Sequence, residues 1–283
     1  MKSHNLFRLA GAAILGALVF ALPLTLSAQS ASAYVKSGLE KFREGNLDGA
    51  IADYTQALDL NSSYLGAYNN RGLARSAQGN FDGAIADYST AIKMKPAYVE
   101  AYYNRGMAAF LQGNYDAAIA DFTKTLELKP DHQSACCYRA MAREGQGNFE
   151  GARADYAKAF ELKGGDDKGA SYLVLHNALL TRRLGRGIDE RLKAVTGWSD
   201  GWTKSLAQFL SDQLSEADLR QRASVAAEGQ KARQQSEALY FAGVVKVIAG
   251  NKAAARADLQ QCFDSTGPAA LMHRLARTEL DRP

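Results

Sequence analysis

The sequence predicts an all-α superhelical solenoid of antiparallel helix pairs, because one helix-turn-helix pattern returns every 34 residues. Each copy holds a Gly-Asn turn, followed by an apolar or aromatic residue and then an acid. The glycines of the four copies are Gly45, Gly79, Gly113 and Gly147. A fixed period of this length is typical of proteins whose units stack on their neighbours. Four copies in phase, without an insertion, disfavour a chance bundle of amphipathic helices.

Small and aromatic side chains recur in step with these turns and predict how the helices of a pair pack. Small residues on the first helix, which let the second approach closely, are Gly38, Gly72, Gly106 and Ala140. Alanines at a matching position of the second helix are Ala50, Ala84, Ala118 and Ala152. Rings that fill the space between pairs are Tyr54, Tyr88, Phe122 and Tyr156. Pro96 and Pro130 end the second helix of two units, because proline cannot continue a helix.

This register resembles the tetratricopeptide repeat (TPR), and the resemblance covers four tandem units in residues 34–164. In TPR arrays the first helix of each pair lines a concave groove, which implies a surface for proteins or peptides. The candidate groove residues are Lys36, Asn69, Asn70, Tyr103, Asn104 and Tyr138. Asn can hydrogen-bond a peptide backbone, and Tyr offers amphipathic contact area. The alternative is that these residues are ordinary polar positions of the surface.

An arginine in three of the repeats is followed by an aspartate sixteen positions later. The pairs are Arg71 with Asp87, Arg105 with Asp121 and Arg139 with Asp155. We predict structural ion pairs between the two helices of a unit, because the acid recurs in step and a bidentate pair fixes orientation. The alternative is that these arginines bind a ligand carboxylate.

Residues 1–33 have the composition of a secretory signal, with a basic start, an apolar run over residues 9–22 and small residues after it. We expect cleavage after Ala33, with a cut after Ala28 as the second choice. The run is short for a membrane span, which needs about 20 apolar residues, so an uncleaved inner-membrane anchor is the weaker alternative. Because the first cysteine is Cys136, no lipid anchor is expected at this end.

The second half of the chain departs from the period and then returns to it. Residues 165–235 predict degenerate helical units, with helical spacing of apolar residues but no clear turn signature. Residues 236–265 predict a fifth repeat, with Gly250-Asn251 at its turn. Residues 266–283 begin with an early proline, carry charge and predict a C-terminal capping helix.

A second resemblance rests on the middle segment, which contains Gly201-Trp202, Phe209-Leu210, Ser215-Glu216 and Leu219. Together with the export signal and the flanking repeats, these residues are similar to NlpI-type TPR proteins of Gram-negative bacteria. The resemblance implies a periplasmic adaptor that dimerises and brings murein hydrolases to a processing protease. Members of that group are outer-membrane lipoproteins, whereas this chain lacks the lipidated cysteine.

The sequence contains no motif for catalysis, for a bound cofactor or for a metal ion. Cys136 and Cys262 are expected as small buried hydrophobes, and no disulfide framework is indicated. Removing residues 1–33 removes two basic residues and no acid, so the net charge falls from +4 to +2. Such a balanced chain does not favour nucleic acid as a partner.

These observations predict a non-enzymatic, exported scaffold or adaptor that binds proteins or peptides in its concave groove. Envelope proteases and peptidoglycan hydrolases are the expected partners, and the chain itself is a candidate to form homodimers. The alternative is an envelope accessory protein that binds a glycan or another non-protein ligand.

Overall fold

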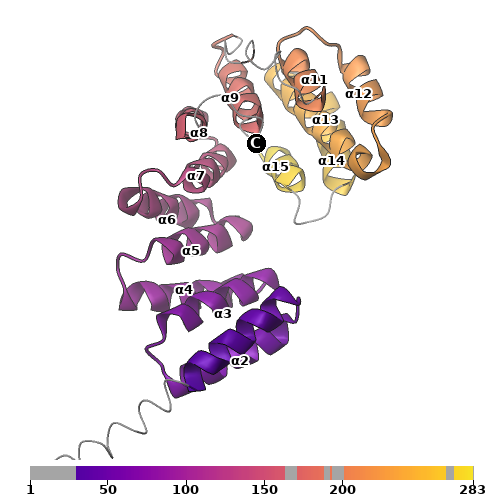
Figure 1. Cartoon of the computed structure of the whole chain (residues 1–283). Helices are drawn as coiled ribbons and strands as arrows, with labels where there is room; N and C mark the ends of the chain where they lie inside the picture. Colours follow the sequence, from indigo (N-terminus) through magenta and orange to yellow (C-terminus); the bar gives the residue numbers. More distant parts are fainter. Residues whose placement is uncertain (1–29, 163–170, 188–191, 193–200, 266–270, 283) are drawn as a thin grey trace, which may run out of the picture. The chain divides into compact units, whose positions relative to one another are not determined.

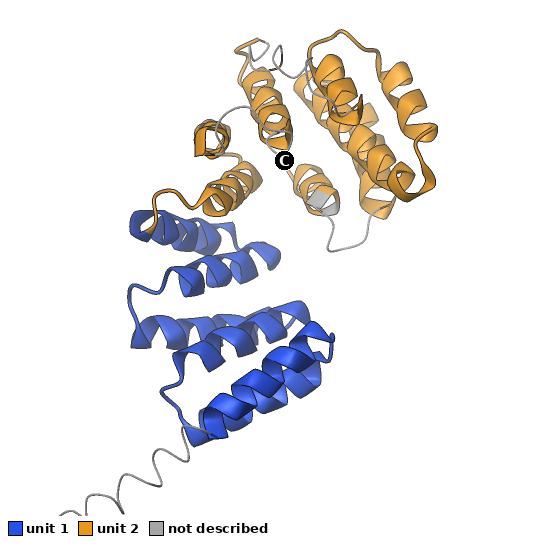
Figure 2. Cartoon of the chain, viewed as in Figure 1, with its two compact units in different colours: residues 1–128 blue, residues 129–283 orange. Residues whose placement is uncertain are grey.

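The computed structural model describes residues 30–162, 171–187, 192, 201–265 and 271–282, and all regular structure in these ranges is helical (Figure 1). The helices fall into two compact units, residues 1–128 and residues 129–283 (Figure 2). Across these ranges no helix is at once long enough and apolar enough to cross a membrane.

Unit 1 consists of antiparallel helix pairs, as the 34-residue period predicts. It begins with a helix over residues 30–43 and continues with α2 (Leu47–Leu60), α3 (Leu65–Ala77), α4 (Phe81–Met94), α5 (Val99–Leu111) and α6 (Tyr115–Leu128). Neighbouring helices pack on one another from α2 through to α6. Helices α4 and α6 end two residues before Pro96 and Pro130, which agrees with the stop signals in the sequence.

The Gly-Asn turns have one geometry throughout. Gly79 has a φ of +80°, a left-handed conformation in which a side chain would be strained. The Asn80 side chain then caps α4, because its Oδ1 accepts the N–H of Gly83 at 3.0 Å. The same pair of roles recurs at Gly250 and Asn251, so the turn of the fifth repeat has the predicted form.

Small residues allow the two helices of a unit to touch. A Cβ atom added to Gly72 of α3 would lie 2.6 Å from Cε1 of Tyr88 on α4. Tyr88 is only 1% exposed, so its ring has no room to retreat. In the first repeat, a Cβ atom added to Gly38 would likewise lie 2.7 Å from Cε1 of Tyr54. The repeated small and aromatic positions are therefore two sides of one contact.

Unit 2 contains the fourth repeat, the middle segment and the fifth repeat. Its helices are α7 (Gln133–Gly145), α8 (Phe149–Leu162), α9 (Ser171–Arg183), α11 (Gly201–Leu210), α12 (Glu216–Ser224), α13 (Glu228–Ile248), α14 (Lys252–Ser265) and α15 (Leu271–Leu280). Helix α13 begins eight residues before the expected start of the fifth repeat at Ser236, because residues 228–235 contain no helix-breaking signal after their single glycine. Most of the predicted signal, residues 1–29, lies outside the described residues. So do residues 163–170, 188–191 and 193–200, most of which belong to the predicted degenerate units.

Helix α15 packs on α14, as expected of a capping helix, but it also contacts α13 and α7. Arg183 of α9 holds Glu279 of α15 with two bonds of 2.8 Å. Beyond the end of α15, Nη2 of Arg282 donates to the Glu144 carbonyl at 2.9 Å. The Phe149 ring lies under both guanidinium groups, 4.3 Å from Arg183 and 4.6 Å from Arg282. The C-terminal segment is therefore joined to α9 by an ion pair, and to the fourth repeat by a hydrogen bond and a cation–π contact of Arg282.

A buried polar cluster lies behind these contacts. The Glu144 side chain is 2% exposed, and its two oxygens accept the hydroxyls of Tyr156 at 3.2 Å and Tyr240 at 3.3 Å. His176 stacks on Tyr156 with ring centroids 5.5 Å apart, and neither of its buried nitrogens has a hydrogen-bond partner among the described residues. Its Nδ1 lies 3.9 Å from Glu144, which is too long for a hydrogen bond.

Burial governs the protonation of this cluster. Desolvation, reinforced by the nearby Glu279 charge, raises the pKa of Glu144 to about 7, although Arg183, Arg282 and the Tyr156 hydroxyl favour the ionised form. Desolvation lowers the pKa of His176 to about 4, so the ring is neutral at physiological pH. The two groups therefore do not form an ion pair at neutral pH.

The Gly72 contact predicts a large difference between two glycines of one helix. Gly72→Ala should destabilise the protein by about 1–3 kcal/mol, because its Cβ overlaps a buried ring. Gly66→Ala, also in α3, places its Cβ 3.6 Å from Tyr64 and should be neutral or stabilising by up to about 1 kcal/mol. Urea unfolding of both variants measures the difference. Equal midpoints would contradict the close packing.

The Glu144 environment predicts a pH-dependent effect of Glu144→Gln. Because the folded pKa is raised, the parent protein loses stability as the pH rises from about 4.5 through about 7, and the amide cannot ionise. The melting temperature of the variant relative to the parent should therefore increase between pH 5 and pH 8. His176 titrates in both proteins and cancels in this comparison. Glu161→Gln, at an exposed site of α8, is the control and should show a constant difference.

Candidate protein-binding surface

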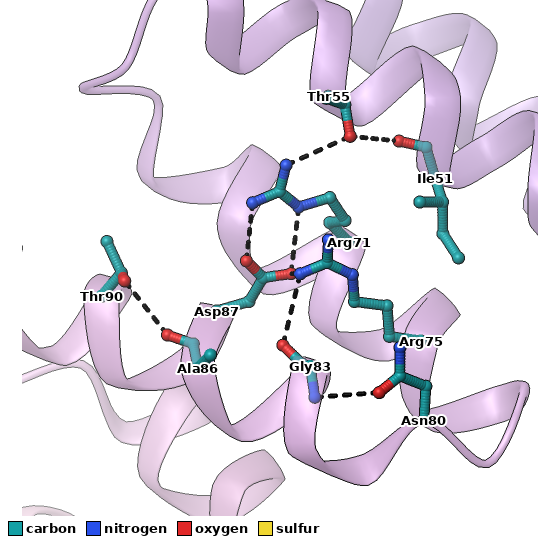
Figure 3. Close-up of polar contacts among 9 residues, drawn as sticks. All are labelled: Ile51, Thr55, Arg71, Arg75, Asn80, Gly83, Ala86, Asp87 and Thr90. Atoms are coloured by element: carbon teal, nitrogen blue, oxygen red, sulfur yellow. Dashed lines mark hydrogen bonds and ion pairs between the residues drawn. The ribbon is translucent and has the colours of Figure 1, made fainter.

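Three arginines of the first helices form the predicted ion pairs with aspartates of the second helices. Nε of Arg71 donates to Oδ2 of Asp87 at 3.0 Å and its Nη2 donates to Oδ1 at 2.7 Å (Figure 3). The corresponding bonds from Arg105 to Asp121 are both 2.8 Å, and those from Arg139 to Asp155 are 2.8 and 2.7 Å. The aspartates are 3–6% exposed, so each acid is buried against its own arginine.

Two of these guanidinium groups, in unit 1, also reach the preceding repeat. Nη1 of Arg71 donates to Oγ1 of Thr55 on α2 at 3.1 Å (Figure 3). Nη1 of Arg105 donates to the Ser89 hydroxyl on α4 at 3.0 Å. One side chain thus fixes three helices at once. The hydrogen bonds that Arg105 donates to Asp121 also raise the pKa of Arg105.

In several repeats a second cationic side chain contacts the aspartate of the Arg–Asp pair. Arg75 donates to Oδ2 of Asp87 at 2.8 Å and to the Gly83 carbonyl at 3.3 Å (Figure 3). In the fifth repeat Lys246 takes this place, 2.6 Å from Asp258. With three of its five N–H groups engaged, Arg71 has little capacity left for a ligand. The structure therefore supports the structural role of these pairs over the ligand-binding alternative.

The candidate groove residues of unit 1 lie on adjacent first helices. Nδ2 of Asn104 on α5 donates to Oδ1 of Asn69 on α3 at 3.0 Å, so these two side chains meet. Asn69 is only 9% exposed, which corrects the expectation that it lies on an open face. Its position is covered because the next repeat stacks over it. Asn69 acts as a positioning residue for Asn104 rather than as a contact for a partner.

The other candidates of unit 1 keep more accessible surface. Lys36 is exposed, whereas Asn70, Tyr103 and Asn104 are half-buried. The Tyr103 ring packs 6.0 Å from the Phe122 ring, so one edge is anchored while the remainder of the residue stays accessible. These four residues, which we call the groove face, offer an ammonium, two amides and an amphipathic ring to a polypeptide.

Tyr138 belongs to unit 2, where it lies half-buried on α7. Because the groove face belongs to unit 1, Tyr138 is not counted among its residues. Cys137 beside it is also half-buried, and Cys136 and Cys262 are fully buried, as expected; none of the three forms a disulfide with a described residue. No group of three His, Cys, Asp or Glu residues able to hold a metal ion occurs within the described ranges.

The residues of the middle-segment signature are mostly core residues. Trp202, Phe209, Leu210 and Leu219 are all buried in the hydrophobic core of unit 2. Nε1 of Trp202 donates to Oε2 of Glu237 at 2.6 Å, a buried bond between α11 and α13. This signature therefore records how the middle segment packs and does not by itself identify a partner.

Sequence reasoning missed the Glu144 cluster and the second cation of the ion-pair network. Glu144 occupies a register position that holds Phe42, Ser76 and Phe110 in the other repeats. The available signal was an acid at a position that holds a ring or a small residue in those repeats, because such a position is expected to be buried. The second cation could have been found because Arg75 and Arg143 recur in step.

Comparison with known proteins agrees with the repeat register. A family profile described as tetratricopeptide repeat matches residues 69–133, and one described as TPR repeat matches residues 38–79. No curated protein sequence is similar enough to this chain to count as a match.

Several solved structures share the fold. A tetratricopeptide repeat protein from Parabacteroides merdae ATCC 43184 aligns over 89% of this chain and 100% of its own length, with a TM-score of 0.63 and 15% identity. A crystal structure of MamA protein aligns over 70% of this chain and 98% of its own length, with a TM-score of 0.53 and 20% identity. MamA from Desulfovibrio magneticus RS-1 aligns over 65% of this chain and 96% of its own length, with a TM-score of 0.53 and 15% identity.

At these identities the structural likeness concerns the fold alone. The profile matches and the repeated contacts nevertheless agree on the same register over the first units. Residues 38–133 are therefore tetratricopeptide repeats, and the protein has a TPR solenoid fold.

Proposed function

We propose that the protein is an exported, non-catalytic scaffold that binds another polypeptide on the groove face. The observation that carries this proposal is that the amides of Asn70 and Asn104 and the Tyr103 ring lie on the first helices of adjacent repeats. The Arg–Asp pairs hold those helices, so the groove face is organised before a partner arrives, which reduces the entropy lost on binding. TPR solenoids offer extended concave surfaces for protein partners.

Cell-envelope proteases and peptidoglycan hydrolases are the partners we propose, on the strength of the NlpI-type resemblance. The signal-like composition of the N-terminus supports export to the periplasm. The chain carries no lipidation cysteine after its apolar run, so attachment through a lipid is not part of the proposal. A homodimer remains the arrangement that the resemblance implies.

We also propose where the signal is cut. Residues 30–33 are helical, and Ala31 is fully buried in a core with Ala50, Tyr54 and Ala67. A cut after Ala33 would remove Ala31 and the first turn of this helix. The buried position of Ala31 therefore favours cleavage after Ala28 over the site preferred on composition.

The binding proposal predicts that groove-face substitutions weaken a defined complex. Lys36→Ala, Asn70→Ala and Tyr103→Ala together should reduce affinity for a purified envelope protease or hydrolase by at least about tenfold, because a few central residues carry most binding energy. Lys93→Ala, at an exposed site of α4, is the control. Candidates are first captured from periplasmic extract and then measured by calorimetry.

Circular dichroism confirms that the triple variant remains folded. An unchanged affinity would contradict the groove face as the binding surface. Retention on peptidoglycan, with no protein captured, would instead favour the glycan-binding alternative.

The processing proposal predicts the N-terminus of the mature protein. Protein recovered from the periplasm should begin at Gln29, as read by intact mass and N-terminal sequencing. Recovery of a chain that begins at Tyr34 would contradict the argument from Ala31. Recovery of the uncleaved chain in the inner membrane would contradict processing altogether.

A further inference from the structure

A pocket of about 270 Å³ opens between the end of α13, the first turns of α14 and the end of α15, all within unit 2. Its floor is apolar and is formed by Val247, Ala255, Leu259 and Leu280. Ala255 and Leu259 are almost fully buried, whereas Val247 and Leu280 keep part of their surface accessible. The pocket can therefore receive a compact hydrocarbon group.

The rim of the pocket is cationic. Lys252 and Arg256 both line it, both are exposed, and neither forms an ion pair with any residue that the structure describes. Arg282 adds a third positive charge, although its Nη2 also lies 3.1 Å from Glu279. Glu279 is the single acid of the wall, and Arg183 already holds it with two bonds. Among the described residues that line the pocket, three are cationic and one is acidic, so the wall carries a net positive charge.

The helix that contributes the rim adds to this field. Lys252 and Ala253 form the first turn of α14, where the helix dipole places partial positive charge. A neighbouring pocket of similar size between α12, α13 and α14 offers a contrast. Its one cation, Arg220, is already paired with Glu216 and Asp258. Only the first of these two pockets joins an apolar floor to unpaired cations.

We propose that this pocket binds a small amphipathic carboxylate, with the hydrocarbon on the apolar floor and the carboxylate between Lys252 and Arg256. Arg256 can hold a carboxylate with two parallel hydrogen bonds, whereas Lys252 supplies a single point charge. A medium-chain fatty acid or an aromatic monocarboxylate has the required size and charge. This site is separate from the groove face and does not depend on the proposed function.

The probe is octanoate, titrated into the full chain below the concentrations at which it forms micelles. Calorimetry and saturation-transfer NMR should give one bound octanoate per chain with a Kd of roughly 0.1–1 mM, the range expected for a ligand with few atoms. Octan-1-ol, which lacks the charge, and acetate, which lacks the tail, should each bind at least about tenfold more weakly.

Two variants separate the two halves of the site. Lys252→Gln with Arg256→Gln should weaken octanoate binding at least about tenfold, and Ala253→Phe should fill the pocket and abolish binding while leaving every charge in place. Lys158→Gln, at an exposed site of α8, is the matched control and should bind like the parent. Circular dichroism verifies folding of each variant.

The proposal is overturned if the double variant binds octanoate as well as the parent does. It is also overturned if octan-1-ol binds equally, because the cations would then have no role. Displacement of octanoate by an equal concentration of inorganic phosphate would show a simple anion site, and that result too would exclude the proposed ligand class.

Discussion

The structure depends on close contact between a small residue of one helix and an aromatic ring of the next. There is no space for even one added carbon atom between Gly72 and Tyr88, and the same close contact recurs between Gly38 and Tyr54 in the first repeat. This contact fixes the separation of the two helices and the position of the ring. Every other repeated feature, including the ion pairs and the accessible first helices, requires that spacing.

The ion pairs determine orientation within this spacing. Buried ion pairs add little net stability, because removing two charges from water costs about as much as their attraction returns. Here they fix the geometry of the helices, since Arg71 binds both Asp87 in its own repeat and Thr55 in the preceding repeat. These directional hydrogen bonds therefore fix the orientation of neighbouring repeats in unit 1, and the alignment of the groove-face residues follows from that orientation.

The 34-residue period predicted the helix pairs well, since a periodic pattern records packing that each unit shares with its neighbours. Helix α2, Leu47–Leu60, follows the turn at Gly45 and contains the predicted packing residues Ala50 and Tyr54. Residues 30–33, which the composition assigned to the signal, belong to the helix that precedes Gly45. The exposure of Asn69 and the cluster around Glu144 could not be predicted, since both depend on neighbours far along the chain; Tyr240 is 96 positions from Glu144.

The bonds between units have a consequence for the order in which the array opens. Arg71 and Arg105 each need the preceding repeat in place to complete their bonds. The first repeat has Ser37 at this position instead, and Asp53 is held by Lys41 and Ser37 of its own repeat. The N-terminal helix pair is thus the least restrained part of unit 1, and local unfolding should start there and move inward one pair at a time. A protease that reached this end would meet a chain that frays gradually rather than one that opens all at once.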